Sequence, residues 1–324
     1  MVGSLGAAVP GAEETGNLEV TEMADWKFNR GLDDEFVDHL NALYDNGESW
    51  WKDLMDDGSV FLAIRDNYLN FYYRGCSLLE LAWQRKNRMA VGKIHYKYLL
   101  KPSMKPEYIS VINGKLKFRI ETDNLFPNRI CVVDLKKSVK RYAEEEKSGV
   151  HDIIMDKKNY NVVDVEIALS DGSSAKRIDI ATLRQTEDGP VLKFFEAKHF
   201  KNKELRAQKD AVPAVVNQLT EYEELLDTHK EDINDSYSRV WSILSKLHGF
   251  KERNENRFSQ LESVKRNWKP LSVDTKPKLV VFGFDEDQRD GNVWKMHRRK
   301  LKKELGKDRL IFRGQAKYID LKSV

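Results

Sequence analysis

The sequence predicts an α/β fold in which a mixed central sheet flanked by helices follows a smaller α+β domain. Residues 161–200 contain three β-branched and apolar runs separated by Ser170-Asp-Gly-Ser-Ser and Thr186-Glu-Asp-Gly-Pro, a pattern typical of consecutive strands. A helical segment follows Pro213. The Leu-Val-Val-Phe run within Lys278–Phe284 is then typical of a buried strand, which a helical crossover would place parallel to its neighbour.

Length and composition predict the domain organisation. The 324 residues suffice for two domains with substantial cores. Residues 1–23 lack periodicity and the basic flank of a secretion signal, so we expect a disordered leader. We assign 24–127 to an N-terminal domain for substrate binding or regulation, and 128–324 to the second domain, with a helical insertion at about 230–276 that forms an arm or lid. Two distant cysteines and no apolar run of membrane-spanning length favour a cytoplasmic protein.

The N-terminal domain is expected to combine helices with an antiparallel meander. Apolar spacing between Leu32 and Met55 predicts one or two helices, broken near Asn46-Gly47. Four strands are predicted after them, at Val60–Arg65, Tyr68–Tyr73, Ser77–Trp83 and Gly92–Leu100. Their aromatic and basic residues could bind phosphates and bases, although these are also ordinary strand residues: Arg65, Tyr68, Tyr72, Tyr73, Arg74, Lys93 and Lys97.

Between the two domains, the sequence predicts a connector and one helix. The proline-containing segment Lys101–Asn128 includes a short strand at Lys115–Ile120. The segment Asp134–Lys147 has apolar residues at helical spacing and a polar run near its end, so we expect a single helix there.

Three charged residues in the predicted meander suggest a catalytic centre. Side chains alternate faces along a strand, so Glu196 and Lys198 share a face. Asp179 lies between Ile178 and Ile180, where a turn-forming acid has no local reason to be. Buried carboxylates without a partner are costly, and therefore Asp179 and Glu196 together invite a cation. Oxygen ligands favour Mg²⁺ or Mn²⁺.

The motif Asp179, Glu196-x-Lys198 resembles that of the PD-(D/E)XK nuclease superfamily, in which an acid on one strand and Glu-x-Lys on the next form the catalytic centre. Ile178 stands where a proline often precedes the first acid. The helix after Pro213 carries Gln218 and Tyr222, similar to the Gln-x-x-x-Tyr motif of RecB-type and lambda-exonuclease-type nuclease domains. The resemblance implies a restriction-endonuclease-like core.

The same resemblance implies roles for individual residues. Asp179 and Glu196 would hold Mg²⁺ or Mn²⁺, while Lys198 would orient the attacking water or stabilise the transition state. Gln218 and Tyr222 would support the lysine or the substrate backbone. Superfamily members often add one further ligand, for which there are candidates in three places: Glu144 or Glu145 in the polar run Glu144-Glu-Glu-Lys, His151 before the first strand, and Glu166 within that strand. A solvated helix end is the alternative for the polar run.

A basic helix is predicted near the C-terminal end of the chain. Residues 276–324 contain 14 Lys or Arg and 7 Asp or Glu residues. Within Trp294–Leu305, we expect nucleic-acid contacts from Lys295, Arg298, Arg299, Lys302 and Lys303, because cations near an acidic metal centre would draw phosphates towards it. A solvated helix face is the alternative.

Together these features predict a metal-dependent deoxyribonuclease acting in antiviral defence or DNA repair. Two alternatives stay open: an RNA-directed or partner-activated effector nuclease, and a nucleic-acid-binding module that kept the fold without the chemistry. DNA is the expected partner. A protein partner or self-association through the N-terminal domain is also compatible with the sequence, and no membrane contact is expected.

Overall fold

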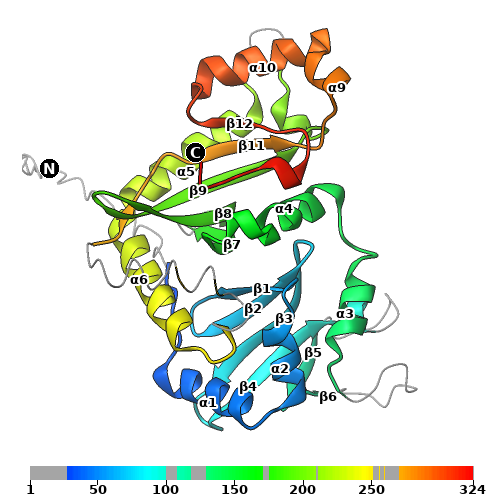
Figure 1. The fold of residues 1–324 in the computed structure, drawn as a ribbon, viewed down its shortest axis with the longest axis vertical. Helices are drawn as coiled ribbons and strands as arrows, with labels where there is room; N and C mark the ends of the chain where they lie inside the picture. Colours follow the sequence, from blue (N-terminus) through cyan, green and yellow to red (C-terminus); the bar gives the residue numbers. More distant parts are fainter. Residues whose placement is uncertain are drawn as a thin grey trace, which may run out of the picture.

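The protein forms two β-sheets arranged one after the other along its long axis (Figure 1). A computed structural model describes residues 28–99, 108–117, 129–170, 175–208, 211–250, 255, 259 and 270–323. Each sheet has six strands: β1–β6 form the first and β7–β12 the second. The described residues contain no helix that combines the length and the apolar character needed to cross a bilayer.

The first sheet is an antiparallel meander, as predicted. Its strands follow chain order: β1 Phe61–Ile64, β2 Tyr68–Tyr73, β3 Cys76–Gln84, β4 Met89–His95, β5 Tyr108–Ile112 and β6 Lys115–Lys117. The expected strand up to Leu100 is too long, because the His95 side chain accepts a hydrogen bond from the Lys97 amide and starts a 3-10 turn. Strand β5 was not predicted, and residues 118–120 lie outside the described part.

Two predicted helical regions have different outcomes. The break at Asn46-Gly47 is confirmed, since α1 (Asp34–Asp45) and α2 (Ser49–Asp56) flank it and Gly47 has a φ of 70°. The single helix predicted at 134–147 is wrong: α3 (Val132–Val139) and α4 (Glu145–Met155) are separate. The break allows the two helices to pack in different places, α3 against β3 and α4 against β9.

The second sheet confirms the predicted meander and the parallel return. Its strands are β7 Val162–Ser170, β8 Ala175–Thr186, β9 Gly189–His199, β10 Ser272–Val273, β11 Lys278–Phe282 and β12 Leu310–Phe312. Strands β7, β8 and β9 pair antiparallel, whereas β11 pairs parallel with both β9 and β12. The sheet order is β12-β11-β9-β8-β7, with β10 beside β9. The class is therefore mixed α/β.

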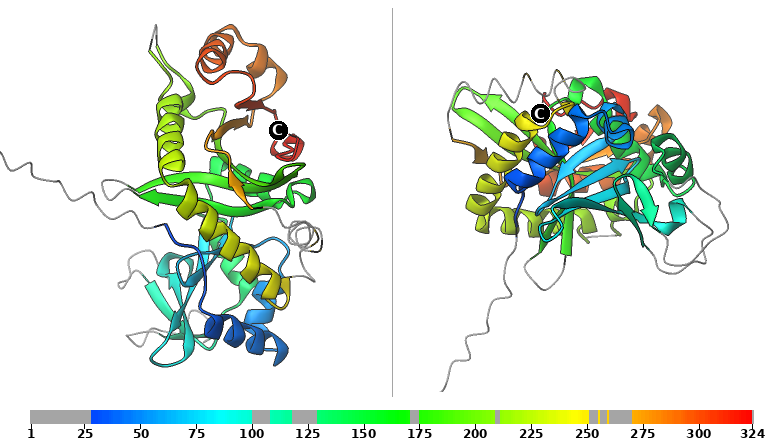
Figure 2. Two further views of the ribbon diagram at one scale, coloured as in Figure 1. Left: turned by 90° about the vertical axis from the view of Figure 1, so that its left-hand side faces the viewer. Right: turned by 90° about the horizontal axis from the view of Figure 1, so that it is seen from below.

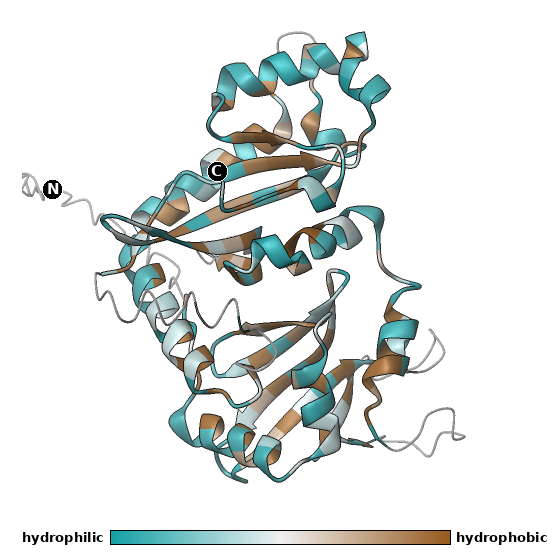
Figure 3. Cartoon of the chain, in the orientation of Figure 1, coloured by the Kyte–Doolittle hydropathy of each residue, from teal (hydrophilic) through white to brown (hydrophobic). Residues whose placement is uncertain are grey.

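Helices cover both faces of the second sheet (Figures 1 and 2). On one face, α5 (Ala214–Thr228) and α10 (Asn292–Leu305) bury Leu219 and Leu301 in the same cluster as Phe194. On the other face, α4 buries Ile153 with Phe195. The short helix α9 (Glu286–Asp290) precedes α10. Colouring by hydropathy shows apolar strands inside and a largely hydrophilic α10 outside (Figure 3).

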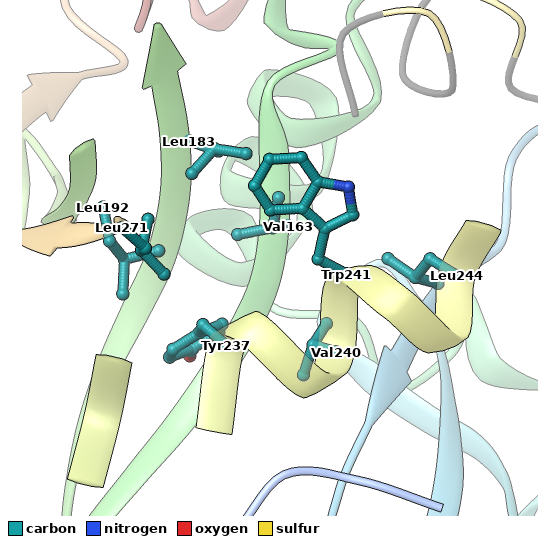
Figure 4. A pocket seen from close by; sticks show the side chains of 8 residues that line it. All are labelled: Val163, Leu183, Leu192, Tyr237, Val240, Trp241, Leu244 and Leu271. Carbon is teal, nitrogen blue, oxygen red and sulfur yellow. The ribbon is translucent and has the colours of Figure 1, made fainter. Parts of the chain in front are cut away.

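The described residues of the predicted insertion include strand β10 of the second sheet and α6 (Lys230–Lys246), which packs against the body of the protein. Its buried residues include Ile233, Tyr237 and Ile243, and it runs from the second sheet to the first (Figures 1 and 2). A pocket of only about 10 Å³ separates it from β7, β8 and β9, lined by Val163, Leu183, Leu192, Tyr237, Val240, Trp241, Leu244 and Leu271 (Figure 4). That volume is at the limit for one water molecule, so α6 closes this side of the sheet.

A buried ion network joins the two sheets. The Asp164 carboxylate in β7 accepts hydrogen bonds from Arg65 Nη1 at 2.5 Å, Arg30 Nε at 3.3 Å and the Tyr237 hydroxyl at 2.9 Å. Arg65 Nη2 also donates to the Val165 carbonyl at 2.6 Å. Arg65, Tyr72 and Tyr73 are each at most 9% exposed, so these three residues are unavailable to an incoming base or phosphate, contrary to one interpretation of the sequence.

Candidate active site

The candidate site lies where strands β8 and β9 separate. The two strands pair between the turn that joins them and the pair Ile180–Phe195. Further from that turn they separate: β8 is still paired with β7, and β9 is paired with β11. The Asp179 carboxylate occupies the fork and accepts a hydrogen bond from the Ala197 amide at 2.7 Å. An acid in the middle of an apolar strand therefore takes the place of a missing strand partner.

Glu196 and Lys198 share a face of β9, as predicted, and form a close ion pair. Lys198 Nζ lies 2.8 Å from Glu196 Oε1 and 2.6 Å from Glu204 Oε2. Glu196 is 2% exposed, and its second oxygen, Oε2, is buried with no hydrogen-bond partner. Such an orphaned carboxylate oxygen is costly and marks a place where a cation or a donor fits.

The protonation of these groups reflects burial and crowding. Burial and the adjacent Glu196 carboxylate raise the pKa of Asp179 well above its ordinary value. Burial also raises the pKa of Glu196 to about 7, although Lys198 opposes the effect. Burial lowers the pKa of Lys198, but the carboxylates of Glu196 and Glu204 outweigh it, so the net shift is upward. Lys198 is consequently a cation at neutral pH, and its single positive charge is too little to stabilise the ionised forms of both Asp179 and Glu196.

Gln218 and Tyr222 lie on one face of α5 and are connected to the fork. Gln218 Nε2 donates to the Tyr222 hydroxyl at 2.6 Å, and that hydroxyl donates to the Arg177 carbonyl at 2.5 Å. Burial and the Glu196 carboxylate raise the pKa of Tyr222, which keeps the hydroxyl protonated as a donor. The pair thus holds the backbone of β8 two residues before Asp179, and the expected support of the lysine or the substrate backbone stays a prediction.

Glu166 is brought to the same place from β7. It lies opposite Asp179, since Val165 pairs with Ile180 and Ile167 with Ile178. Its φ is 53°, a left-handed conformation that costs on the order of 1–3 kcal/mol for a residue with a side chain.

The charge of Glu166 reaches the Asp179 carboxyl. After burial and Glu196, the Glu166 carboxylate is a further cause of the raised pKa of Asp179. Arg177 Nη1 lies 3.3 Å from Glu166 Oε2. Glu166 is therefore the auxiliary candidate that the structure places beside the first acid.

The acid of the polar run in α4 that accepts a hydrogen bond from the backbone at the end of β9 is Glu146, and not the predicted Glu145. Glu145 is 64% exposed and pairs with Lys201 at 3.0 Å. Glu146 instead accepts hydrogen bonds from the His199 amide at 2.8 Å and from Asn202 Nδ2 at 2.9 Å. The close approach of α4 requires Gly149, where a Cβ would lie 2.1 Å from the Phe282 ring.

These contacts fix the turn that follows β9. Asn202 caps the 3-10 turn Lys203–Leu205, which carries Glu204, the second partner of Lys198. Sequence reasoning missed both Glu146 and Glu204. Glu146 could have been found from the sequence, because it lies at helical spacing with Gly149 and Ile153, which indicates one helix face. No sequence pattern points to Glu204.

His151 lies at the boundary with the first sheet, inside α4. It is 5% exposed, and its ring meets that of Tyr73 edge-on with centroids 5.2 Å apart. Burial and the nearby Arg74 lower the pKa of His151 to about 4, so its ring is neutral at neutral pH. Its described contacts are thus with the N-terminal sheet, and the structure does not bring it to Asp179 or Glu196.

The predicted cations of α10 are on the surface but differ in their surroundings. Lys295, Arg299, Lys302 and Lys303 are exposed. Arg298 is half-buried, with its guanidinium 4.8 Å from the centroid of the Phe312 ring. The inner face of the same helix contacts the turn after β9, since the Ala207 amide donates to His297 Nδ1 at 3.4 Å and Lys300 Nζ donates to the Ala207 carbonyl at 3.1 Å.

The donor set fits Mg²⁺ or Mn²⁺ better than a metal that needs a full protein cage. Within the described ranges, no group of three His, Cys, Asp or Glu side chains is arranged to hold an ion. Two acids are nevertheless available, Asp179 and Glu196, and Oε2 of Glu196 is unpartnered. Mg²⁺ commonly binds through one or two carboxylates and keeps several water ligands.

Known proteins provide no further assignment of this site. Comparisons with protein-family models, with curated proteins and with solved structures find no match to the chain.

Proposed function

We propose that this protein is a metal-dependent nuclease that hydrolyses phosphodiester bonds of DNA at the fork between β8 and β9. The observation that carries the proposal is the meeting of the Asp179 and Glu196 carboxylates with the Lys198 ammonium, next to an unpartnered buried oxygen. Acids held in this excess accept a divalent cation, which would supply charge neutralisation at the scissile phosphate and lower the pKa of bound water.

Each residue of the site would have a separate role in the reaction. Asp179 and Glu196 would hold the ion, with Glu166 as the nearest further acid. The raised pKa of Lys198 makes it a cation. It would therefore orient the attacking water or stabilise charge on the phosphate, and would not act as a base. Gln218 and Tyr222 would keep the β8 backbone in place beside Asp179.

The arrangement of the second sheet supports a restriction-endonuclease-like core. The antiparallel meander β7-β8-β9 is followed by α5 and by the parallel strand β11, with helices on both faces. The first acid lies on the middle strand of the meander, and Glu-x-Lys lies on the third. The Gln-x-x-x-Tyr pair lies on the next α-helix, in the order the resemblance implies.

Exposed cations support a polyanionic substrate. Lys295, Arg299 and Lys302 recur at three- and four-residue spacing on α10, and DNA is a ligand whose affinity comes largely from such phosphate contacts. The inner side of α10 contacts Ala207, three residues after Glu204, which is a partner of Lys198.

A cleavage panel tests the proposal. Purified protein is incubated with linear, circular and single-stranded DNA and with RNA, each in Mg²⁺, Mn²⁺ or EDTA. We expect cleavage of at least one DNA with Mg²⁺ or Mn²⁺ and none with EDTA. Lys198→Ala should reduce the rate on the order of 10²-fold or more, because one group that stabilises transition-state charge contributes about that much.

The matched control is Lys201→Ala, which removes an exposed lysine three residues away whose partner is Glu145. Equal activity in Lys198→Ala and wild type would overturn the assignment of the lysine. Cleavage of RNA alone would favour the RNA-directed alternative. Binding of DNA without cleavage under any metal would identify a binding module.

A further inference from the structure

The first sheet has one packed face and one open face along β4, β5 and β6. Alternate residues of these strands, including Ile94, Val111 and Leu116, point into the core. The intervening residues are exposed or half-buried. At the β1–β2 end the outward face is covered, since Phe61 and Tyr72 pack into the cluster of the second sheet. Within the described ranges, the outward side chains of β4–β6 have no such cover.

Four cations and two aromatic rings lie on this open face, which we define by Lys93, His95, Tyr108, Lys115, Lys117 and Arg129. The register places them together. His95 pairs with Tyr108, and Lys93 and Lys117 lie on either side of the same β5 residue. Arg129 forms a bridge with Lys115 and extends the face beyond β6. Residues opposite one another in a ladder share a face, so all six side chains project the same way.

The charge of the open face is strongly positive. Lys93 is neutralised by Glu80, with Nζ and Oε1 2.9 Å apart. In the described part of the chain, no carboxylate pairs with Lys115, Lys117 or Arg129. Three cations in neighbouring strands, without a carboxylate partner among the described residues, would repel one another, and a polyanion would relieve that repulsion. The face is therefore complementary to a phosphate backbone.

Tyr108 indicates which kind of polyanion fits. It is 54% exposed, and its ring meets that of His95 at a centroid distance of 5.2 Å and an angle of 63°. An exposed tyrosine on an open sheet offers a π-face on which an unpaired base can stack, whereas a base within a duplex is already stacked on its neighbours. An open sheet face that combines such a ring with cations suits single strands.

We propose that the open face of the first sheet is a binding site for single-stranded nucleic acid, in which Tyr108 stacks on a base and Lys115, Lys117 and Arg129 contact phosphates. The site is on a different sheet from Asp179 and Glu196 and involves no residue of α10. Its occupancy does not require cleavage or a metal.

Binding in EDTA tests this site separately from catalysis. A fluorescein-labelled 20-nucleotide oligothymidylate and a labelled 20-base-pair duplex are titrated by anisotropy across a salt series. Tyr108→Ala should weaken oligothymidylate binding at least about fivefold, whereas Tyr108→Phe keeps the ring and should bind like wild type. Lys115→Glu with Lys117→Glu should flatten the salt dependence by roughly 0.7 units for each lost phosphate contact.

The charge-matched control is Lys137→Glu with Lys230→Glu, two exposed lysines on α3 and α6, and it should bind oligothymidylate like wild type. Thermal melts of each variant show that folding is retained. The proposal is overturned if wild type does not bind the oligothymidylate, or if Tyr108→Ala binds as tightly as wild type. It is also overturned if the open-face variants lose duplex or polyglutamate binding to the same extent, which would indicate charge attraction alone.

Discussion

The Asp179 carboxylate accepts a hydrogen bond from the Ala197 amide, an interaction across the fork between β8 and β9 at 2.7 Å. It ties the first acid of the site to the residue between Glu196 and Lys198. The three charged groups are therefore fixed by the sheet itself, and do not depend on a loop. Rigid placement of this kind is what a catalytic constellation requires.

Metal binding should stabilise the folded protein through Asp179. Mn²⁺ that binds only the folded state adds about 2.7 kcal/mol at 100 times its dissociation constant by mass action, and its binding would also relieve the repulsion between the two acids. A thermal melt should therefore show a higher Tm with Mn²⁺ than with EDTA. Asp179→Asn should abolish the increase, and Asp152→Asn, an exposed acid on α4, should retain it. An increase of equal size in Asp179→Asn would place the ligands elsewhere.

The contribution of Glu196 to stability without metal should fall as pH rises from about 4.5 to about 7, whereas His151, whose pKa is lowered to about 4, contributes in the opposite direction. The folded-state pKa of Glu196 is raised to about 7 from an ordinary 4.5. Between these values Glu196 binds more protons in the folded state than in the unfolded state, so its ionisation favours unfolding, by up to about 3 kcal/mol. Urea denaturation in EDTA at several pH values measures this.

Glu196→Gln is the matched variant for the pH experiment. Its amide does not ionise, so the decrease in stability that Glu196 causes over this interval should be absent from the variant, although Asp179 still contributes some dependence. Identical slopes for Glu196→Gln and wild type would show that Glu196 titrates normally.

Reversal of charge on α10 should weaken binding to duplex DNA without changing the chemistry. Arg299→Glu with Lys302→Glu removes two exposed cations from one face of the helix. We expect the slope of log binding constant against log salt to flatten by about 0.9 units for each lost phosphate contact, while cleavage at saturating DNA persists. Anisotropy measures the slope, with Lys137→Glu and Lys230→Glu as the charge-matched control. An unchanged slope would identify α10 as a solvated face.

The ion network around Asp164 should contribute strongly to stability. Asp164→Asn leaves Arg30 and Arg65 buried opposite a neutral amide, and the removal of one member of a buried pair costs about 3–5 kcal/mol. The exposed pair of Lys137 and Asp134 is the control, for which Lys137→Ala should cost less than about 1 kcal/mol. Urea denaturation compares the two, and equal losses would contradict a structural role for the network.

The sequence was informative wherever the determinants are local. Alternation along β9 predicted the shared face of Glu196 and Lys198, and turn residues predicted the meander, because both depend on near neighbours. Helical spacing likewise predicted that Gln218 and Tyr222 would meet. The same local rules failed at Tyr142 and its surroundings, where a polar stretch with helical composition separates two helices that pack in different places.

The remaining features depend on contacts that no local pattern encodes. Glu204 reaches Lys198 from a turn whose capping residue, Asn202, is held by Glu146 from a helix more than fifty residues earlier. Arg65 was interpreted as a surface residue, since nothing near it in sequence reveals that Asp164, 99 residues away, buries it. Likewise, the strand of Tyr108 follows a proline-containing segment that suggested only a connector.

Helix α6 and the Asp164 network have a consequence for how this protein can be divided or recombined. A fragment that begins at residue 128 would retain Asp164 and Tyr237 but lose Arg30 and Arg65, and its buried carboxylate would have no cation. Truncation at residue 128 would thus remove the cations that neutralise a buried acid of the second sheet. An N-terminal part from another protein could replace residues 1–127 without leaving Asp164 unpaired only if it supplied cations at the positions of Arg30 and Arg65.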